Sequence, residues 1–246
     1  MIDLSIEVDI LLQGFPGRTN RGTLGFCNIT LIKSDRLILY DTGHFSDKLN
    51  LINEFKKRTI PLEKVDTIVL SHLHYDHCLN IDLFKNAEII LDKKELEYAL
   101  SNEPEKVGDY YIPKYLIPII KERKFINAEE ELEIANKVYV LKTPGHTPGS
   151  ISLLIDNGKR KIAIVGDAIK NAWEFIKGKP EQVYGKIEDA KESIKKIKEL
   201  NAIIIPGHDA HFIFEKNIVK YLKNVSLKLI VKTLPYSDDW SIYTIP

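Results

Sequence analysis

The chain has 246 residues, of which 44% are hydrophobic and 28% are charged, a globular composition that excludes a disordered or collagen-like protein. Its 35 basic and 35 acidic side chains balance, which argues against the strongly basic surface of a dedicated nucleic-acid binder. The two cysteines form no Cys-x-x-Cys pair, and the sequence shows neither a secretory signal nor an apolar run of about 18 residues. We therefore expect a cytoplasmic protein without a membrane partner.

The first hundred residues predict mainly strands. Alternating or β-branched apolar residues favour strands at residues 6–13, 25–32, 37–40, 65–70 and 88–91. The second and third of these strands are expected to pair as a hairpin around Ser34-Asp35. Residues 14–22 contain three glycines and a proline and predict a loop.

Two helices are expected between these strands. Ser46 is predicted to cap a helix that ends near residue 58, with Leu49, Ile52 and Phe55 on one face. Asp92 is predicted to cap a shorter helix that ends near residue 100. Both helices follow a strand, as expected when helices cover a sheet.

Residues 101–124 form a weaker pattern, interrupted by Pro104, Pro113 and Pro118. We interpret this segment as a helical insertion rather than a linker. Four of its side chains favour burial: Tyr110, Tyr111, Tyr115 and Leu116. The segment is therefore expected to pack against the rest of the chain.

The second half repeats the arrangement of strands with a helix. Strands are predicted at residues 137–141, 150–155, 161–165 and 202–205, and Asn157-Gly158 predicts a hairpin between the middle pair. Residues 187–200 predict the clearest helix, because apolar residues recur at spacings of three and four. Two such halves predict a layered α/β sandwich and one domain over residues 1–246.

Three of the seven histidines lie in Ser71-His72-Leu73-His74-Tyr75-Asp76-His77. After an extended strand, His72 and His74 project to the same side and can share one metal ion. Asp76 and His77 lie where the chain turns, so they can face a second ion. A solvated polar loop is the alternative, but this segment follows a strand that is expected to be buried, where functional loops gather.

Three further strands end in a tight turn with a ligand-type residue. These residues are His146 in Thr143-Pro144-Gly145-His146-Thr147-Pro148-Gly149, Asp167 after Gly166, and His208 after Pro206-Gly207. A single such residue is often structural, but four strand ends together favour a metal site. Imidazole and carboxylate ligands suit zinc, and also iron or manganese.

This ordered set resembles the metal ligands of the metallo-β-lactamase superfamily, and Asp41 in Tyr40-Asp41-Thr42-Gly43 matches the upstream aspartate of that family. The resemblance runs from about residue 8 to residue 209. Leu11-Leu12-Gln13-Gly14, the glycine-rich loop and Asp41-Thr42-Gly43 are also similar to the metallo-β-lactamase domain-containing protein 1 group.

The resemblance implies a four-layer αββα sandwich with two divalent metal ions. One ion would be held by His72, His74 and His146. The other would be held by Asp76, His77 and His208. Asp167 would bridge the two ions, and Asp41 would hold a ligand imidazole in one tautomer unless it only stabilises its turn. Seven ligands exceed the needs of one tetrahedral ion and suit two.

The implied chemistry is hydrolysis of a small-molecule ester, thioester or lactone by a hydroxide that bridges the two ions. Asp76 is the expected catalytic residue, as an acceptor or carrier of the proton of that hydroxide. Asp167 stands where the main zinc β-lactamases use cysteine, which argues against β-lactam hydrolysis. Lys170 stands where acyl-homoserine lactonases carry a tyrosine, which argues against lactone hydrolysis.

Substrate-binding residues are less clearly marked. Arg18, Arg21 and Lys170 could bind an anionic group, or be solvated surface charges. Three aromatic residues could line a pocket or belong to the core: Trp173, Phe175 and Tyr184. Cys78 is expected to pack in the core, and His44 and His211 are expected not to be ligands.

Two other functions remain open. A nuclease would be supported by the lysines near the C-terminus, which more simply form a solvated face: Lys216, Lys220, Lys223, Lys228 and Lys232. A mononuclear-iron dioxygenase of the same superfamily would need one iron ion instead of two zinc ions. Apolar surface at residues 101–124 or 222–246 would serve a homodimer.

Overall fold

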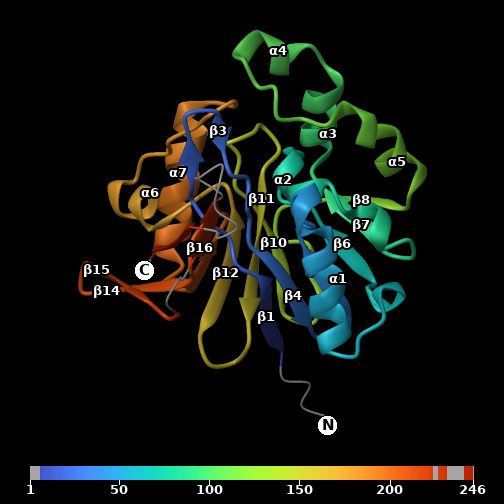
Figure 1. Ribbon diagram of the computed structural model, residues 1–246, viewed down its shortest axis with the longest axis horizontal. Coiled ribbons are helices and arrows are strands. Elements are labelled where there is room, and N and C mark those ends of the chain that lie inside the picture. Colours follow the sequence, from blue (N-terminus) through green and yellow to red (C-terminus); the bar gives the residue numbers. More distant parts are fainter. Residues whose placement is uncertain (1–5, 224–226, 232–240, 246) are drawn as a thin grey trace.

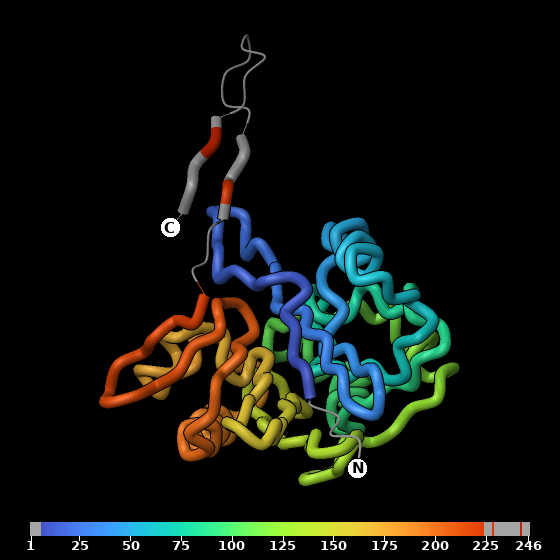
Figure 2. The backbone as a smooth tube through the Cα atoms, turned by 90° about the horizontal axis from the view of Figure 1, so that it is seen from below, coloured from blue at the N-terminus to red at the C-terminus, as the bar shows by residue number. Residues whose placement is uncertain are grey.

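The computed structural model describes residues 6–223, 227–231 and 241–245. Two β-sheets lie face to face and helices cover their outer faces, so the chain forms the predicted αββα sandwich (Figure 1). Each sheet is built from one half of the chain. Figure 2 shows the blue-to-green half beside the yellow-to-orange half.

The first sheet has the strand order β1-β4-β5-β6-β7-β8. Its strands are β1 (Glu7–Leu12), β4 (Ile29–Lys33), β5 (Leu37–Tyr40), β6 (Thr67–Val69), β7 (Glu88–Leu91) and β8 (Phe125–Asn127). The pairs β1–β4 and β4–β5 are antiparallel, which confirms the predicted hairpin, and β5 to β8 are parallel. The predicted loop after β1 carries a small hairpin of β2 (Arg18–Thr19) and β3 (Gly22–Thr23).

The second sheet has the order β15-β14-β13-β12-β11-β10-β9. Its strands are β9 (Glu133–Ala135), β10 (Val138–Lys142), β11 (Ile151–Asp156), β12 (Lys161–Gly166), β13 (Ile203–Pro206), β14 (Phe212–Glu215) and β15 (Ile218–Tyr221). The antiparallel β11–β12 pair confirms the hairpin at Asn157-Gly158, whereas β12 and β13 run parallel. Separately, β16 (Leu227–Val231) pairs with β17 (Ser241–Ile245).

The α-helices of the described residues are α1 (Lys48–Lys57), α2 (Tyr75–Cys78), α3 (Lys93–Leu100), α4 (Glu103–Val107), α5 (Ile117–Glu122), α6 (Ala172–Lys177) and α7 (Ile187–Glu199). The 3-10 turns are η1 (Phe45–Asp47), η2 (Leu62–Lys64), η3 (Ile81–Leu83) and η4 (Lys114–Leu116). As predicted, Asp92 caps α3, because its carboxylate accepts a hydrogen bond from the N–H of Lys94. None of the described helices is long and apolar enough to cross a bilayer.

Alternation along the strands divides the core into three apolar layers. In β5, Ile38 and Tyr40 face the second sheet while Leu39 faces the helices on the outer side of the first sheet. In β12, Ile164 faces the first sheet while Val165 packs against α6 and α7. Strands that are buried on both faces are typical of such sandwiches, and they hold the strand ends rigidly.

Three expectations about local structure were wrong. His44, not Ser46, caps the first turn: its Nδ1 accepts a hydrogen bond from the N–H of Ser46, and η1 precedes α1. Leu49 is 66% exposed, because the buried face of α1 is formed by Leu51 and Phe55.

In the segment 101–124, Tyr110 and Tyr115 are 79% and 68% exposed, so the expected burial was also wrong for them. Leu116 is buried, and the side chain of Tyr111 is partly buried. The segment contains α4, η4 and α5, and only part of its apolar surface is covered. Four of the C-terminal lysines are exposed: Lys216, Lys220, Lys223 and Lys228. Lys232 lies outside the described residues.

Candidate metal centre

Four strand ends place the predicted ligands at one edge of the sandwich, and a fifth places Asp41 there. Asp41 follows β5, the segment from Ser71 to His77 follows β6, and His146 lies in the turn between β10 and β11. Asp167 directly follows β12, and His208 follows β13 by two residues. Because both sheets contribute, the seven predicted ligands meet between the two halves of the chain.

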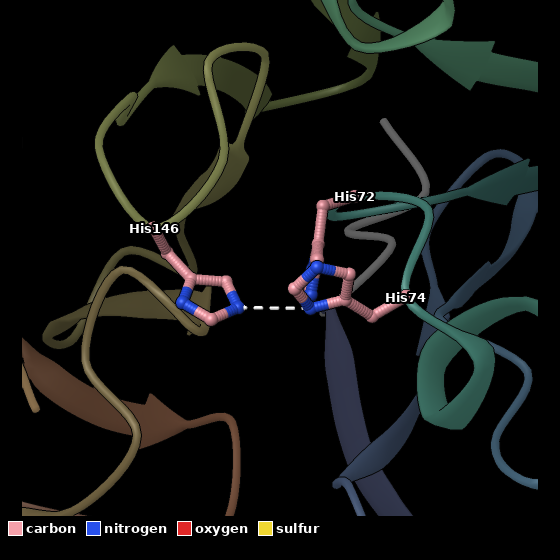
Figure 3. Close-up of side chains that lie close together, drawn as sticks. All are labelled: His72, His74 and His146. Carbon is pink, nitrogen blue, oxygen red and sulfur yellow. Dashed lines mark hydrogen bonds between the residues drawn. The ribbon is translucent and has the colours of Figure 1, made fainter. Parts of the chain in front are cut away.

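The first group of side chains joins the two halves directly. His72, His74 and His146 offer ring nitrogens that all lie within 4.8 Å of one another, and all three residues are buried. Figure 3 shows the ring of His146 reaching from its loop toward the rings of His72 and His74, with Nε2 of His146 3.0 Å from Nδ1 of His74.

The second group consists of Asp76, His77 and His208, which also lie within 4.8 Å of one another. Asp167 lies between the groups. Its Oδ1 is 3.3 Å from Nε2 of His77 and 3.2 Å from Nε2 of His208, and its Oδ2 is 3.3 Å from Nε2 of His146. One carboxylate therefore faces both groups, as expected of a bridging ligand.

Each of the five histidines is held by its other ring nitrogen. His72 contacts the hydroxyl of Ser71 through its Nδ1, and His77 contacts Oδ2 of Asp41 through its Nδ1. The Nδ1 atoms of His146 and His208 contact the carbonyls of Gln182 and Phe26. His74 contacts Oδ2 of Asp109 through its Nε2. Carbonyl and carboxylate oxygens only accept, so the nitrogens bonded to them carry the proton. The opposite nitrogen keeps its lone pair, and such partners typically orient metal-binding histidines.

The electrostatics favour a neutral imidazole at His72 and His146. Burial lowers the pKa of His72 well below its usual value, and the neighbouring His77 lowers it further. Burial, and then the charge of Lys170, likewise lower the pKa of His146. Neutral imidazole is the form that binds metal. At His77 burial acts to lower the pKa, but the nearby Cys27, Asp167 and Asp41 raise it well above its usual value.

Three observations test whether a metal would fit this cluster. Nε2 of His72, Nε2 of His77 and Oδ1 of Asp167 are buried without a hydrogen-bond partner, which is costly for a polar atom. The facing nitrogens of His74 and His146 both carry lone pairs, which repel at 3.0 Å unless a cation lies between them. The separations of 3.0–3.3 Å approach the ~3.3 Å between ligands about 2.0–2.1 Å from a tetrahedral zinc. The residues therefore fit divalent metal ions.

Two backbone features fix the carboxylates of this site. Asp41 has a φ of 59°, which is uncommon for a non-glycine residue, and its carboxylate accepts hydrogen bonds from N–H and Oγ of Ser71 and from His77. A Cβ atom on Gly207 would lie 2.1 Å from Oδ1 of Asp167, so a larger residue would displace this carboxylate.

A cleft with about 530 Å³ of space not occupied by atoms, partly open to solvent, adjoins the cluster. Four of the predicted ligands line it: His74, Asp76, Asp167 and His208. Its other side is formed by residues that include Phe15, Arg18, Tyr75, Tyr111, Lys170 and Gln182. The cluster can therefore be reached by a small molecule.

Two of the three predicted cationic residues line the cleft. Lys170 is mostly buried, and its Nζ lies 3.3 Å from Oδ2 of Asp167 and donates to Oε1 of Gln182 at 2.5 Å. Arg18 lies at the rim and pairs with Glu181. Arg21 is exposed and is not one of the residues that line the cleft.

The three aromatic residues considered as pocket residues have different environments. Phe175 belongs to the core and Trp173 is 49% exposed, whereas the ring of Tyr184 packs against His74 and His146. Cys78 packs in the core, as expected. His44 and His211 lie in none of the metal-type groups found among the described residues.

Two side chains of the site were missed in the sequence. Ser71 joins Asp41 to His72 and was treated only as the end of a strand. Asp109 lies in the segment 101–124, where no local pattern distinguishes it from other acidic residues. The carbonyls of Phe26 and Gln182 carry no residue-type signal at all, so only the fold reveals them.

The sequence that forms this site is similar to known proteins. The family model of the metallo-beta-lactamase superfamily matches residues 22–208, which include the strands and turns that carry all seven predicted ligands. The chain belongs to the metallo-β-lactamase superfamily. It is thus an enzyme, a metal-dependent hydrolase, as the resemblance implied.

Relatives in this superfamily include the "Probable metallo-hydrolase" of Methanocaldococcus jannaschii, which is 29% identical over 73% of this chain and 74% of its own length. The N-acyl homoserine lactonase of Bacillus thuringiensis is 32% identical over 65% of this chain, a match that spans 62% of that enzyme. The metallo-beta-lactamase domain-containing protein 1 of Xenopus laevis is 26% identical over 84% of this chain and 81% of its own length. The last match agrees with the narrower resemblance noted in the sequence.

The fold of the superfamily is also found in solved structures. A quorum-quenching N-acyl homoserine lactone lactonase superposes with a TM-score of 0.62 and 26% identity, covering 84% of this chain and 89% of that one. This similarity extends over both sheets and supports the four-layer arrangement described above.

Proposed function

We propose that this chain is a dinuclear hydrolase that cleaves an ester, thioester or lactone of a small molecule. The observation that carries the proposal is the convergence of unpaired ligand atoms from both halves of the chain around the carboxylate of Asp167. Leaving these buried atoms without a partner is costly, and a metal ion would satisfy them. Two ions are proposed because the seven candidate ligands exceed the four that one tetrahedral ion takes.

In this proposal each of the two groups would hold one divalent ion, and Asp167 would be a ligand of both. The ligands would be His72, His74 and His146 for one ion, and Asp76, His77 and His208 for the other. Zinc is the first choice, with iron or manganese as alternatives. Bound ions supply Lewis-acid polarisation of the substrate oxygen and lower the pKa of water toward ~7.

We assign proton transfer to Asp76. Its Oδ2 lies 3.5 Å from Nε2 of His208, and the residue also lines the cleft, so its carboxylate reaches both the cluster and the substrate space. Burial acts to raise the pKa of this carboxyl, but charge on His77 and His208 holds the pKa below its usual value. Asp76 would thus be ionised at neutral pH in the metal-free protein. In the loaded site His77 and His208 would be neutral, the positive charge of the ions would keep Asp76 ionised, and a carboxylate oxygen could accept a proton from a water molecule.

Lys170 is the residue we assign to orienting the substrate. Its Nζ lies beside Asp167 at the cleft, where it can donate to a carbonyl or carboxylate oxygen. The lactonase among the relatives brings lactones into the substrate range, whereas a lysine at this position distinguishes the chain from those enzymes. Esters and thioesters that carry an anionic group are therefore the first substrates to test.

The decisive experiment is metal content per chain in protein purified without added metal, measured for wild type, His72→Ala and the control His44→Ala. About two zinc ions in wild type and in the control, with fewer in His72→Ala, would support the proposal. Esters, thioesters, lactones and phosphodiesters would then be screened. Wild type that binds no metal, even after reconstitution, would overturn it.

Other outcomes would favour the alternatives. About one iron ion per chain would favour the mononuclear-iron dioxygenase. Phosphodiester cleavage with an affinity for single-stranded nucleic acid that falls steeply with salt would favour the nuclease.

A further inference from the structure

Asp109 lies outside both sheets, between α4 and η4, yet its side chain is fully buried. Its carboxylate accepts three hydrogen bonds. Oδ2 accepts from Nε2 of His74 at 3.1 Å and from the hydroxyl of Tyr98 at 2.9 Å, and Oδ1 accepts from the N–H of Tyr111 at 3.1 Å. The segment between α4 and η4 thus contacts His74, a candidate metal ligand, through a direct hydrogen bond.

We propose that Asp109 is a positioning residue that holds His74 with its proton on Nε2 and its lone pair on Nδ1, and so sets the affinity for one of the two ions. This inference rests on the proposed two-metal function. Nδ1 of His74 is the atom that lies 3.0 Å from Nε2 of His146, so the orientation of this one ring decides whether the first group is complete.

The chemistry of the three partners requires a carboxylate. Each of them presents a hydrogen to Asp109, and a carboxylate only accepts. An asparagine has one accepting oxygen, so its NH₂ group would face a donor on one side. If that side is His74, the imidazole can accept at Nε2 only by moving its proton to Nδ1, the nitrogen needed as a ligand.

The same segment also shapes the cleft. The carbonyl of Tyr111 accepts a hydrogen bond from the N–H of Tyr75 at 2.9 Å, and the Tyr111 ring packs against the ring of His74. Tyr111 and Tyr75 both line the cleft. Residues 109–111 therefore contact the candidate ligand His74 on one side and the cleft on the other.

The test is the zinc affinity of Asp109→Asn, measured by competition with a chelator. Tyr98→Phe is the matched control, because it removes one hydrogen bond from the same oxygen but leaves the carboxylate facing His74. We expect Asp109→Asn to raise the dissociation constant of one ion by about 10–100-fold and to leave the other unchanged. The visible spectrum of the cobalt-loaded variant should change for one site only, and Tyr98→Phe should stay close to wild type.

Different failures have different meanings. If wild type binds two ions and Asp109→Asn binds both with wild-type affinity, the role of Asp109 is overturned while the proposed function stands. If wild type binds none, the proposed function fails and this inference fails with it.

A second measurement does not depend on the variant folding. Nitrogen-15 NMR of metal-free wild type should show His74 protonated on Nε2. A proton on Nδ1 instead would overturn the inference.

Discussion

Two buried aspartates form hydrogen bonds with histidines of the candidate metal centre from different parts of the molecule. Asp41 lies at the end of β5, inside the sandwich, and Asp109 lies in the helical segment outside it. Both carboxylates accept three hydrogen bonds, and in each case one donor is a histidine of the motif after β6. A buried carboxylate thus orients a histidine at the end of a sheet strand, and a second one does so from the helical segment outside the sheets.

The difference between them is how far each one reaches. Asp41 holds His77 directly, and through the hydroxyl of Ser71 it also reaches His72, so it touches a member of each group. Asp109 reaches only His74 among the predicted ligands. Asp41 therefore orients ligands of both proposed ions, whereas Asp109 orients a ligand of only one. Substitutions should separate the two aspartates by the number of ions they affect.

The largest effect is expected from Asp167→Ala, which removes the carboxylate that faces both groups. We expect the affinity for both ions to fall by more than the ~10–100-fold typical of residues that only orient a ligand, with loss of activity. Isothermal titration with zinc measures this. Asp189→Ala, on the exposed face of α7, is the control and should bind as wild type does. Retention of one ion at wild-type affinity would contradict a bridging role for Asp167.

Asp41→Asn should come next. Asparagine tolerates the positive φ of this position, so the backbone should persist, but its NH₂ group would face a donor. We expect both ions to bind about 10–100-fold more weakly, in contrast to the single ion affected by Asp109→Asn. Asp92→Asn, a change at a buried carboxylate that caps α3, controls for general destabilisation. An effect on only one ion would show that Ser71 does not transmit the support to His72.

The last effect is on folding stability and not on metal affinity. It concerns Glu174, which accepts the N–H groups of Lys170 and Glu181 and so anchors the loop whose Gln182 carbonyl holds His146. Burial raises the pKa of Glu174 to about 7, above the ordinary value of 4.5. The folded state then binds more protons than the unfolded state between pH 4.5 and 7. The free energy of unfolding should fall with rising pH in this window, by at most about 1.4 kcal/mol per pH unit.

Denaturant unfolding of metal-free wild type and Glu174→Gln, compared at pH 5 and pH 7, measures this contribution. The variant cannot titrate at this position, so the difference between the two proteins should depend on pH. A difference that stays constant between these two values would disprove the assignment.

Much of the fold could be predicted because local pattern and tertiary environment agree. The continuous apolar run of β5, which is buried on both faces, and the Asn157-Gly158 turn both reflect the packing that is found. The short strands β8 and β9 were not predicted, since three residues are too few for a periodic signal. Tyr110 and Tyr115 were misjudged because their size suggests burial, whereas tyrosine is only intermediate in its tendency to be buried.

The candidate site also contains residues that the sequence predicts and residues that it does not. Each candidate ligand directly follows a strand or lies in a tight turn after one, so its residue type and its position in sequence both point to the edge of the sheets. Asp109 is 35 residues from His74, in a segment without a regular pattern, and nothing local shows that they meet. The carbonyls that hold His146 and His208 are beyond any inference from residue type.

The division of the two sheets between the two halves of the chain has a consequence for assembly. On the proposed assignment, four ligands come from the half that ends with β8 and three from the half that begins with β9. The ions would then act as a reversible cross-link, and loading would stabilise the fold by an amount that rises with the logarithm of the free metal concentration. The two fragments of a chain cut between β8 and β9 would share both the ligand set and the apolar layer between the sheets, so zinc would strengthen an association that the core already favours.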